Sequence, residues 1–454
     1  MPTSAQTHTA IDAPTKTCPQ FTILPLPEPA STPHFSSPLH THSERPALAG
    51  RKKTREALLL LFCDPVPREC LLLWLLTHSE WRQAVHWLNV TGLALYFLDR
   101  VEQLDMRDML PAFVLARLRR SLASNTERTA ALMTEWTDIN RAFQNAGLSY
   151  ANLKGFSLGP PSVPRPELRS QLDLDFLVAA DSAPEARRIL EDRGYHLRSA
   201  SPRSLEFNAN DEKPLTLRDL YKATPHRYVE VHIEPAASPL LGRTEVRRVH
   251  HLPLPVLDPI DLFLGQGLHV YKHLRGEFTR PAHLLEFRRH VIARSEDLAF
   301  WRQLRALAEK DPRHPVGLGI VTLLITHLMG PFAPEALTTW TVDPLPPAAR
   351  LWVELCAHDI VLSGTNGTKF NFLLKEALDP TGIPPQRPLR QALFPPKLLL
   401  PVAPSSNKSL ISSLRHRRQQ LRYIFIRVPF HLVQGLRYWR ASHRLRKLLT
   451  HKNF

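Results

Sequence analysis

The sequence has few of the residues that define disulfide-rich, zinc-finger or membrane-spanning proteins. Its 454 residues include only four cysteines. Cys63 and Cys70 are too far apart in sequence for a zinc-binding pair, and four scattered cysteines do not make a disulfide framework. No apolar run reaches the roughly 20 residues of a membrane helix, and the first residues lack the basic end and apolar stretch of a secretory signal. These absences favour a cytoplasmic protein with reduced thiols.

Acidic residues are missing from the C-terminal tenth of the chain, where most of the net charge of +16 is concentrated. Residues 408–454 contain twelve Lys and Arg, interleaved aromatic residues, and no Asp or Glu. A segment of this kind suits RNA, an anionic membrane surface or an acidic partner. A helix that packs on the body and exposes solvated arginines would show the same pattern, so both interpretations stay open.

Composition and hydrophobic spacing divide the chain into six segments. The first is dense in Pro, Ser and Thr and is predicted to be disordered. Apolar residues at three-and-four spacing predict helices on both sides of a central strand-rich segment, with three to five helices before it. We expect a disordered arm at 1–50, a helical segment at 51–146, a core at 147–250, a helical segment packing on the core at 251–335, an irregular Pro-rich region at 336–406 and a basic helical tail at 407–454.

Three short strands are predicted within the central segment. "LSYANLKG", "LDLDFLVA" and "RYVEVHIEP" are rich in strand-forming residues and are bounded by Gly, Pro or polar residues. One helix lies between the second and third strands, with Ser182 and Glu185 as a capping box and Gly194 at its end. The predicted order of the core is therefore strand, strand, helix, strand.

Two acids interrupt the apolar second strand. Because residues i and i+2 of a strand point to one side about 6.6 Å apart, Asp173 and Asp175 share a face. A pair of carboxylates supplies the oxygen ligands that Mg²⁺ prefers, and two such ions form the usual clamp for phosphoryl or nucleotidyl transfer. Solvated or arginine-paired aspartates at a strand end are the plainer interpretation.

The third strand adds an acid to this hypothesis. Glu230, His232 and Glu234 alternate onto one face, and pairing beside the second strand would place Glu230 against the two aspartates. Upstream, "NLKGFS" ends a strand in a glycine turn, where backbone N–H groups and Ser157 could approach a triphosphate.

These segments together resemble a known family. "YANLKG", "LRSQLDLDFLV", a helix ending in "EDRGY", and "VEVHIE" are similar in order and spacing to uncharacterised bacterial nucleotidyltransferases of the DNA polymerase β superfamily. The resemblance is strong over about 85 residues and extends loosely over Thr54 to Pro401. It implies an α+β fold, with a small mixed sheet of the polymerase β nucleotidyltransferase type flanked by N- and C-terminal helical segments.

The resemblance also implies the roles of individual residues. Asp173 and Asp175 match the metal-binding aspartates, and Glu230 matches the third acid, which helps to deprotonate the acceptor hydroxyl. The residues matched to nucleotide binding are Lys154, Gly155, Ser157, Arg169 and His232, with Arg169 expected to pair with a phosphate or a carboxylate. Three positions depart from the family pattern, namely Phe156 after the glycine, Leu172 in place of Gly, and Glu286 in place of a frequent Asp.

The implied function is Mg²⁺-dependent transfer of an NMP group from an NTP, with ATP as the expected nucleotide, to an unidentified peptide, small metabolite or RNA. The alternative is a catalytically silent fold that binds nucleic acid or an anionic surface. His269 and His273 are four residues apart on a predicted helix, the spacing of a zinc pair, but Val270 replaces the glutamate of a metalloprotease motif. We expect these histidines to pack or to make a polar contact behind the site.

Overall fold

The computed structural model describes residues 50–209, 221, 223, 227–234, 240–249, 252–276, 278–363, 367–378 and 410–451, with side chains of the last segment described only in part before residue 428. The arm predicted at 1–50 therefore lies outside the described residues except for Gly50.

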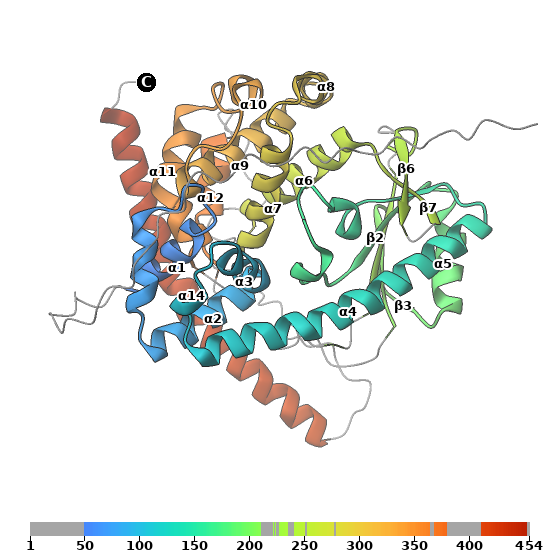
Figure 1. Ribbon diagram of the computed structural model, residues 1–454, viewed down its shortest axis with the longest axis horizontal. Coiled ribbons are helices and arrows are strands. Elements are labelled where there is room, and N and C mark those ends of the chain that lie inside the picture. Colours follow the sequence, from blue (N-terminus) through green and yellow to red (C-terminus); the bar gives the residue numbers. More distant parts are fainter. Residues whose placement is uncertain are drawn as a thin grey trace, which may run out of the picture. The chain divides into compact units, whose positions relative to one another are not determined.

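The fold contains a seven-stranded mixed sheet, which lies to the right of most helices in Figure 1. Its order is β3-β4-β5-β2-β1-β7-β6, and the β2–β5 and β1–β7 pairs are parallel while the others are antiparallel. The strands are β1 (Tyr150–Asn152), β2 (Leu174–Val178), β3 (His196–Ser201), β4 (Ser204–Asn208), β5 (Tyr228–Ile233), β6 (Thr244–Val249) and β7 (Leu252–Leu257). This confirms the α+β class and the mixed sheet.

The three predicted strands are β1, β2 and β5, which lie side by side in the middle of the sheet. The hairpins β3–β4 and β6–β7 extend it on both sides and are additional to the prediction. Most of β3 is exposed and has no apolar alternation. Pro253 and Pro255 within β7 argue against a strand because proline cannot donate to a ladder.

One face of the sheet carries the core that holds β2 in place. Leu174, Phe176 and Val178 point into a cluster with residues of α4 (Ala112–Asn145) and α5 (Ala183–Asp192), where Phe176 contacts Phe143 edge-on. Because side chains alternate along a strand, Asp175 and Leu177 point to the opposite face. The predicted division of β2 into an apolar and an acidic side is therefore confirmed.

The ends of α5 differ in part from the prediction. Ser182 precedes the helix but makes no capping hydrogen bond from its side chain, so the predicted capping box with Glu185 is wrong. The Ser182 hydroxyl is instead engaged by Asp181 and by the backbone N–H of Ser149. Gly194 has a φ of 79° just after the helix and provides its predicted end.

Helices surround the sheet. Those before the core are α1 (Arg51–Leu60), η1 (Arg68–Leu75), α2 (His78–Thr91), α3 (Ala94–Gln103), η2 (Arg107–Met109) and α4; the short turns η3 (Gly155–Leu158) and η4 (Pro166–Leu168) lie between β1 and β2. Those after it are α6 (Pro259–Leu274), α7 (Pro281–Ala293), α8 (Leu298–Ala308), α9 (Arg313–Met329), α10 (Glu335–Thr341), α11 (Pro347–Val361), α12 (Asn371–Leu378) and α14 (Leu410–His451).

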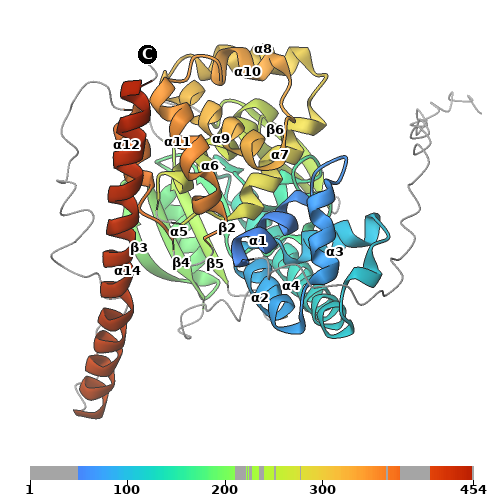
Figure 2. The same cartoon turned by 90° about the vertical axis from the view of Figure 1, so that its left-hand side faces the viewer.

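The C-terminal part contains more helix than predicted. Residues 336–406 were expected to be irregular, yet α10, α11 and α12 occupy much of 335–378, and 379–409 lie outside the described residues. The basic tail forms α14, which packs beside α11 (Figure 2). Within the described residues, no helix combines the length and apolar character that are needed to span a membrane.

Candidate functional site

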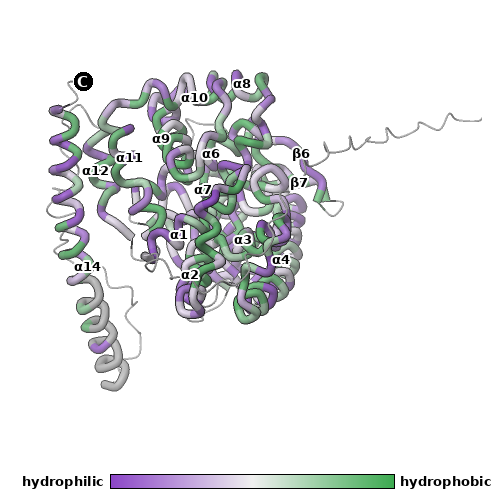
Figure 3. The backbone as a smooth tube through the Cα atoms, turned by 60° about the vertical axis from the view of Figure 1, so that its left-hand side comes forward, coloured by the Kyte–Doolittle hydropathy of each residue, from purple (hydrophilic) through white to green (hydrophobic). Residues whose placement is uncertain are grey.

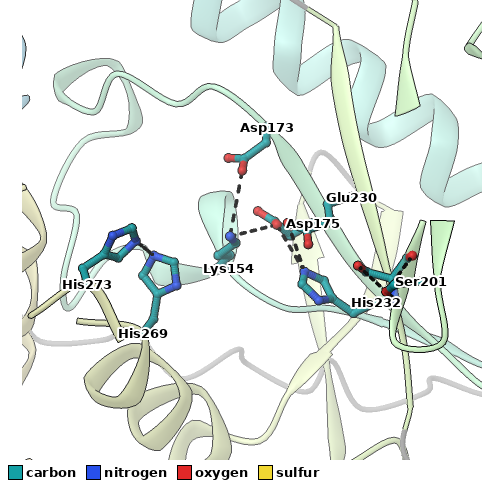
Figure 4. A network of polar contacts seen from close by, with 9 residues as sticks. Lys154, Asp173, Asp175, Ser201, Glu230, His232, His269 and His273 are labelled. Carbon is teal, nitrogen blue, oxygen red and sulfur yellow. Dashed lines mark hydrogen bonds and ion pairs between the residues drawn. The ribbon is translucent and has the colours of Figure 1, made fainter. Parts of the chain in front are cut away.

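Asp175 and Glu230 stand opposite each other on neighbouring parallel strands. The register of β2 and β5 pairs Asp175 with Glu230 and Leu177 with His232. Asp173 comes just before β2, on the same side as Asp175. Strand pairing therefore gathers acids that are more than fifty residues apart in sequence at one end of the central strands (Figure 4).

Two basic side chains contact these acids. The Lys154 Nζ lies 2.9 Å from Oδ1 of Asp175 and 3.9 Å from Oδ2 of Asp173. The His232 Nε2 lies 3.6 Å from Oδ1 of Asp175 and 3.5 Å from Oε2 of Glu230. The Asp175 side chain is 1% exposed, whereas that of Asp173 is 43% exposed. Asp175 is thus a buried anion surrounded by cations, and Asp173 is the accessible acid.

The charges of these groups depend on one another. Burial favours the neutral form of Asp175, but its contacts with His232 and Lys154 outweigh burial and lower its pKa. Desolvation and the nearby Asp175 charge raise the pKa of Asp173. Burial opposes the charged ring of His232, yet its two carboxylate neighbours raise its pKa to about 9. His232 is therefore cationic at neutral pH. Together with Lys154, it offsets the negative charges of Asp175 and Glu230.

One group of side chains at this site could hold a metal ion. Ligand atoms of Asp175, Glu230 and His232 all lie within 4.8 Å of one another. Asp173 is not in that group, because the Lys154 ammonium lies between its carboxylate and that of Asp175. The structure thus brings Asp175 and Glu230 together as predicted, adds His232 to them, and places Asp173 on the other side of a cation.

Two cavities adjoin the acids. The larger, of about 910 Å³, is lined by Lys154, Asp173 and His232 among others. The smaller, of about 270 Å³, is bordered by Glu230. Asp173 and Leu172 border both cavities. A ligand in the larger cavity would therefore meet Asp173 and Lys154 directly.

The glycine turn after β1 packs more tightly than a phosphate cradle would. Gly155 has a φ of 71°, and a Cβ at this position would lie 2.5 Å from Nε2 of Gln171. That amide also donates to the backbone oxygen of Asp173, 3.0 Å away. Phe156 packs on Trp136, and Ser157 is buried and does not line the larger cavity. Gln171 therefore covers the face of Gly155, while Lys154 is the charged side chain of this turn that lines the cavity.

Arg169 has a carboxylate partner within the protein. Its Nε donates to Oε1 of Glu286 at 3.1 Å, and the Tyr96 hydroxyl donates to the same oxygen at 2.9 Å. Both Arg169 and Glu286 line the larger cavity. The Glu286 position that departs from the family pattern therefore fixes the predicted phosphate-binding arginine in the cavity wall.

Helix α4 holds the segment that leads into the acids. The Asn125 Nδ2 donates to the backbone oxygens of Glu167 and Arg169 at 2.7 and 3.1 Å, and the buried Arg128 donates to that of Gln171 at 2.7 Å. The prediction from sequence did not include Gln171, Asn125 or Arg128. A lone amide or guanidinium on a helix face carries no local pattern that would connect it with a segment forty residues away.

Comparisons with known proteins identify a family for more than half of the chain. The profile of a family described as "Uncharacterised nucleotidyltransferase" matches residues 77–330. The crystal structure of an antigenic nucleotidyltransferase-like protein from Paracoccidioides brasiliensis is similar at 11% sequence identity and a TM-score of 0.26, and covers 43% of this chain and 91% of that chain. A search of curated proteins gives no match.

Proposed function

The chain belongs to the family of uncharacterised nucleotidyltransferases, and we propose that it transfers an NMP group from an NTP, with ATP as the expected donor, to an acceptor in a Mg²⁺-dependent reaction. The observation that carries this proposal is the register that sets Asp175 against Glu230, with Asp173 beside them at the cavity. The acceptor classes we consider are a peptide, a small metabolite and RNA.

The acidic side chains suit a divalent cation. Oδ1 of Asp175 is buried and accepts no hydrogen bond of regular geometry from the described residues, and its neighbours there are the cations Lys154 and His232. Carboxylate oxygens are the ligands that Mg²⁺ prefers. We assign Asp173, Asp175 and Glu230 to hold it. When bound, Mg²⁺ would neutralise charge on the phosphates of the nucleotide.

The remaining chemistry is assigned to the protein's own side chains. Glu230 is 29% exposed and its contact with His232 lowers its pKa, so it is a carboxylate that can accept the proton of an acceptor hydroxyl. The acceptor oxygen forms a bond to the α-phosphorus, the bond from that phosphorus to the bridging oxygen breaks, and pyrophosphate leaves. Lys154 and Arg169 line the cavity and place positive charge beside a triphosphate.

The test is transfer of label from α-³²P-ATP by the full chain, with Mg²⁺ and with pools of peptides, metabolites or RNA as acceptors. We expect Asp175→Asn and Asp173→Asn to reduce labelling by on the order of 10²-fold or more, since each removes a carboxylate assigned to hold the Mg²⁺ that neutralises charge in the transition state. Asp138→Asn, on the exposed side of α4, is the matched control. Equal labelling by wild type and both site variants would refute the assignment. Absence of labelling from every pool would favour the catalytically silent binding protein.

A further inference from the structure

Three histidines meet in the wall of the larger cavity, apart from the acids. His269 and His273 are four residues apart on α6 and therefore share a face, and His283 reaches them from α7. All three line the cavity that Lys154 and Asp173 also border. Figure 4 shows His269 and His273 turned toward each other near Lys154.

The spacing of their nitrogens fits a metal ion. Nε2 of His269 and Nε2 of His273 are 3.1 Å apart. The His283 ring lies 5.3 Å from each of the other two rings by centroid, and one nitrogen from each ring lies within 4.8 Å of the others. Two nitrogens bound to one tetrahedral zinc at about 2.0–2.1 Å are roughly 3.3 Å apart. Small ring rotations would therefore bring all three onto one ion.

The hydrogen bonding of the cluster also fits. Nδ1 of His283 is buried and has no hydrogen-bond partner among the described residues. Lys154 and Arg280 line the same cavity. The cluster thus holds one buried ring nitrogen, that of His283, which packing alone leaves unsatisfied.

We propose that His269, His273 and His283 bind a divalent transition metal such as Zn²⁺, with a fourth coordination position open to the cavity. Three protein ligands with one open position are typical of catalytic zinc, and imidazole selects Zn²⁺ over Mg²⁺. The site is distinct from the acids proposed to hold Mg²⁺. Because Lys154 and Arg280 oppose a bare dication, we expect an anion such as hydroxide as the fourth ligand. The proposal goes beyond the expected polar contact, which the pair makes through its Nε2 atoms at 3.1 Å.

The test is metal binding by the full chain after removal of metals with a chelator. We expect one equivalent of Zn²⁺ per chain by calorimetry, and visible absorption of tetrahedral Co²⁺ in its place. His269→Gln, His273→Gln and His283→Asn should each weaken Zn²⁺ binding at least tenfold. The matched control is His314→Gln, because His314 lines the same cavity but lies outside the cluster.

The design separates this site from the acidic one. Asp175→Asn should leave Zn²⁺ affinity within about twofold of wild type, and circular dichroism checks that each variant is folded. If a variant fails to fold, the wild-type Co²⁺ spectrum still decides whether the ligand set contains nitrogen donors in tetrahedral geometry. Absence of stoichiometric Zn²⁺ binding, or equal affinity in wild type and the three cluster variants, would overturn the proposal. Neither result depends on nucleotidyl transfer.

A second surface stands out on α14. Its inner face packs on the body, where Arg437 pairs with Asp359 at 3.1 Å and Arg446 pairs with Glu376 at 2.9 Å. Large apolar side chains are exposed along its length, at Leu421, Phe425, Val428, Leu432, Leu436 and Trp439. Their spacing of three and four residues places them in one stripe. Figure 3 shows hydrophobic and hydrophilic residues alternating along the coloured part of the helix.

The charge of α14 indicates what covers this stripe. Residues 410–451 contain no Asp or Glu, and Arg440, Arg444 and Lys447 are exposed. A helix with Trp, Phe and Leu on one face and Arg and Lys beside it is typical of helices that lie in the interface of an anionic bilayer. Phe425 and Trp439 could stack on RNA bases, but the other four side chains of the stripe are aliphatic and suit lipid chains better than bases. We infer that α14 docks on an anionic lipid surface.

Sedimentation of the full chain with phosphatidylserine-containing vesicles tests this inference. We expect binding that salt weakens, that pure phosphatidylcholine vesicles do not support, and that Leu432→Glu with Trp439→Glu reduces at least tenfold. Val246→Glu is the control, because Val246 is 71% exposed on β6. Equal binding by the double variant and wild type would overturn the inference. The inference would also be overturned if the double variant bound vesicles like wild type but no longer formed a dimer. The same holds if it bound vesicles like wild type but no longer bound RNA.

Discussion

Asp175 and Glu230 occupy directly paired positions of the parallel strands β2 and β5, so that a ladder of backbone hydrogen bonds fixes the separation of the two acids. Two groups held in this way are expected to act as a unit. Removing either should abolish the same step, and removing both should cost little more than removing one.

This relationship predicts the activities of a mutant cycle. Asp175→Asn and Glu230→Gln should each lower the rate of nucleotidyl transfer by on the order of 10²-fold or more. The double variant should show nearly the same loss as Asp175→Asn alone. Single-turnover rates with α-³²P-ATP should be measured for wild type, for the two single variants and for the double variant. Losses that multiply in the double variant would show that the two acids have independent roles.

The conformation and surroundings of Gly155 predict a cost for any side chain at this position. Gly155→Ala meets both a φ of 71° and the Gln171 amide, whereas Gly147→Ala meets a φ of 67° with open space around it. Gly147→Ala serves as the control and should lose about 1 kcal/mol of unfolding free energy from backbone strain alone. Gly155→Ala should lose about 1–3 kcal/mol more from overpacking. Urea unfolding measures both, and equal losses would mean that Gln171 moves away freely.

Lys154 is expected to stabilise the fold by balancing a buried acid. Lys154→Met leaves Asp175, which is 1% exposed, with His232 as its remaining ion-pair partner among the described residues. We expect a loss of about 3 kcal/mol of unfolding free energy, because an unpaired buried charge is strongly destabilising. The double variant Lys154→Met with Asp175→Asn should regain part of the lost unfolding free energy, because it no longer contains the buried charge. The control is Lys52→Met, whose ion pair with Asp359 is on the surface and should contribute less than about 1 kcal/mol.

His290 predicts a dependence of stability on pH. It is buried, its ring contacts Gln266 and Phe263, and burial together with Arg294 and Arg247 lowers its pKa from 6.5 to about 4. Between these values the unfolded chain binds the proton and the folded chain does not, so stability falls as pH decreases through this window. The contribution should fall by about 2 kcal/mol from pH 7 to pH 5.

Comparison with His290→Gln isolates this effect. The variant can keep a contact with Gln266 but cannot titrate, so its unfolding free energy should fall by about 2 kcal/mol less than that of wild type over the same pH range. Urea unfolding at pH 5, 6 and 7 measures the difference. An identical pH dependence in both proteins would show that His290 is not the group responsible.

The sequence was sufficient to predict the acidic face because its signal is local. Alternation at i and i+2 put Asp173 and Asp175 on one side of a strand, and the same period in β5 offered Glu230 and His232. The pairing of β2 with β5 then followed from three predicted strands. Phe176 follows Asp175 and lies on the opposite, apolar face of β2, where it contacts Phe143, as the same alternation predicts.

Features that depend on contacts between distant segments were not predictable. The spacing of His269 and His273 is visible in the sequence, but His283 comes from another helix and no motif links it to them. Gln171 and Arg128 likewise act through single hydrogen bonds to backbone oxygens. Such contacts are set by tertiary packing, so they appear only once the helices and the sheet are placed together.

The position of Lys154 has a consequence for the order in which ligands can enter. A cation arriving between Asp173 and Asp175 must displace an ammonium already held 2.9 Å from Asp175. Binding of a free metal ion alone would therefore gain little free energy, because the aspartates would exchange their attraction to the Lys154 ammonium for attraction to the ion. A triphosphate offers the displaced ammonium a new anion. In the proposed reaction, joint arrival of Mg²⁺ and nucleotide would therefore be favoured over arrival of the ion alone.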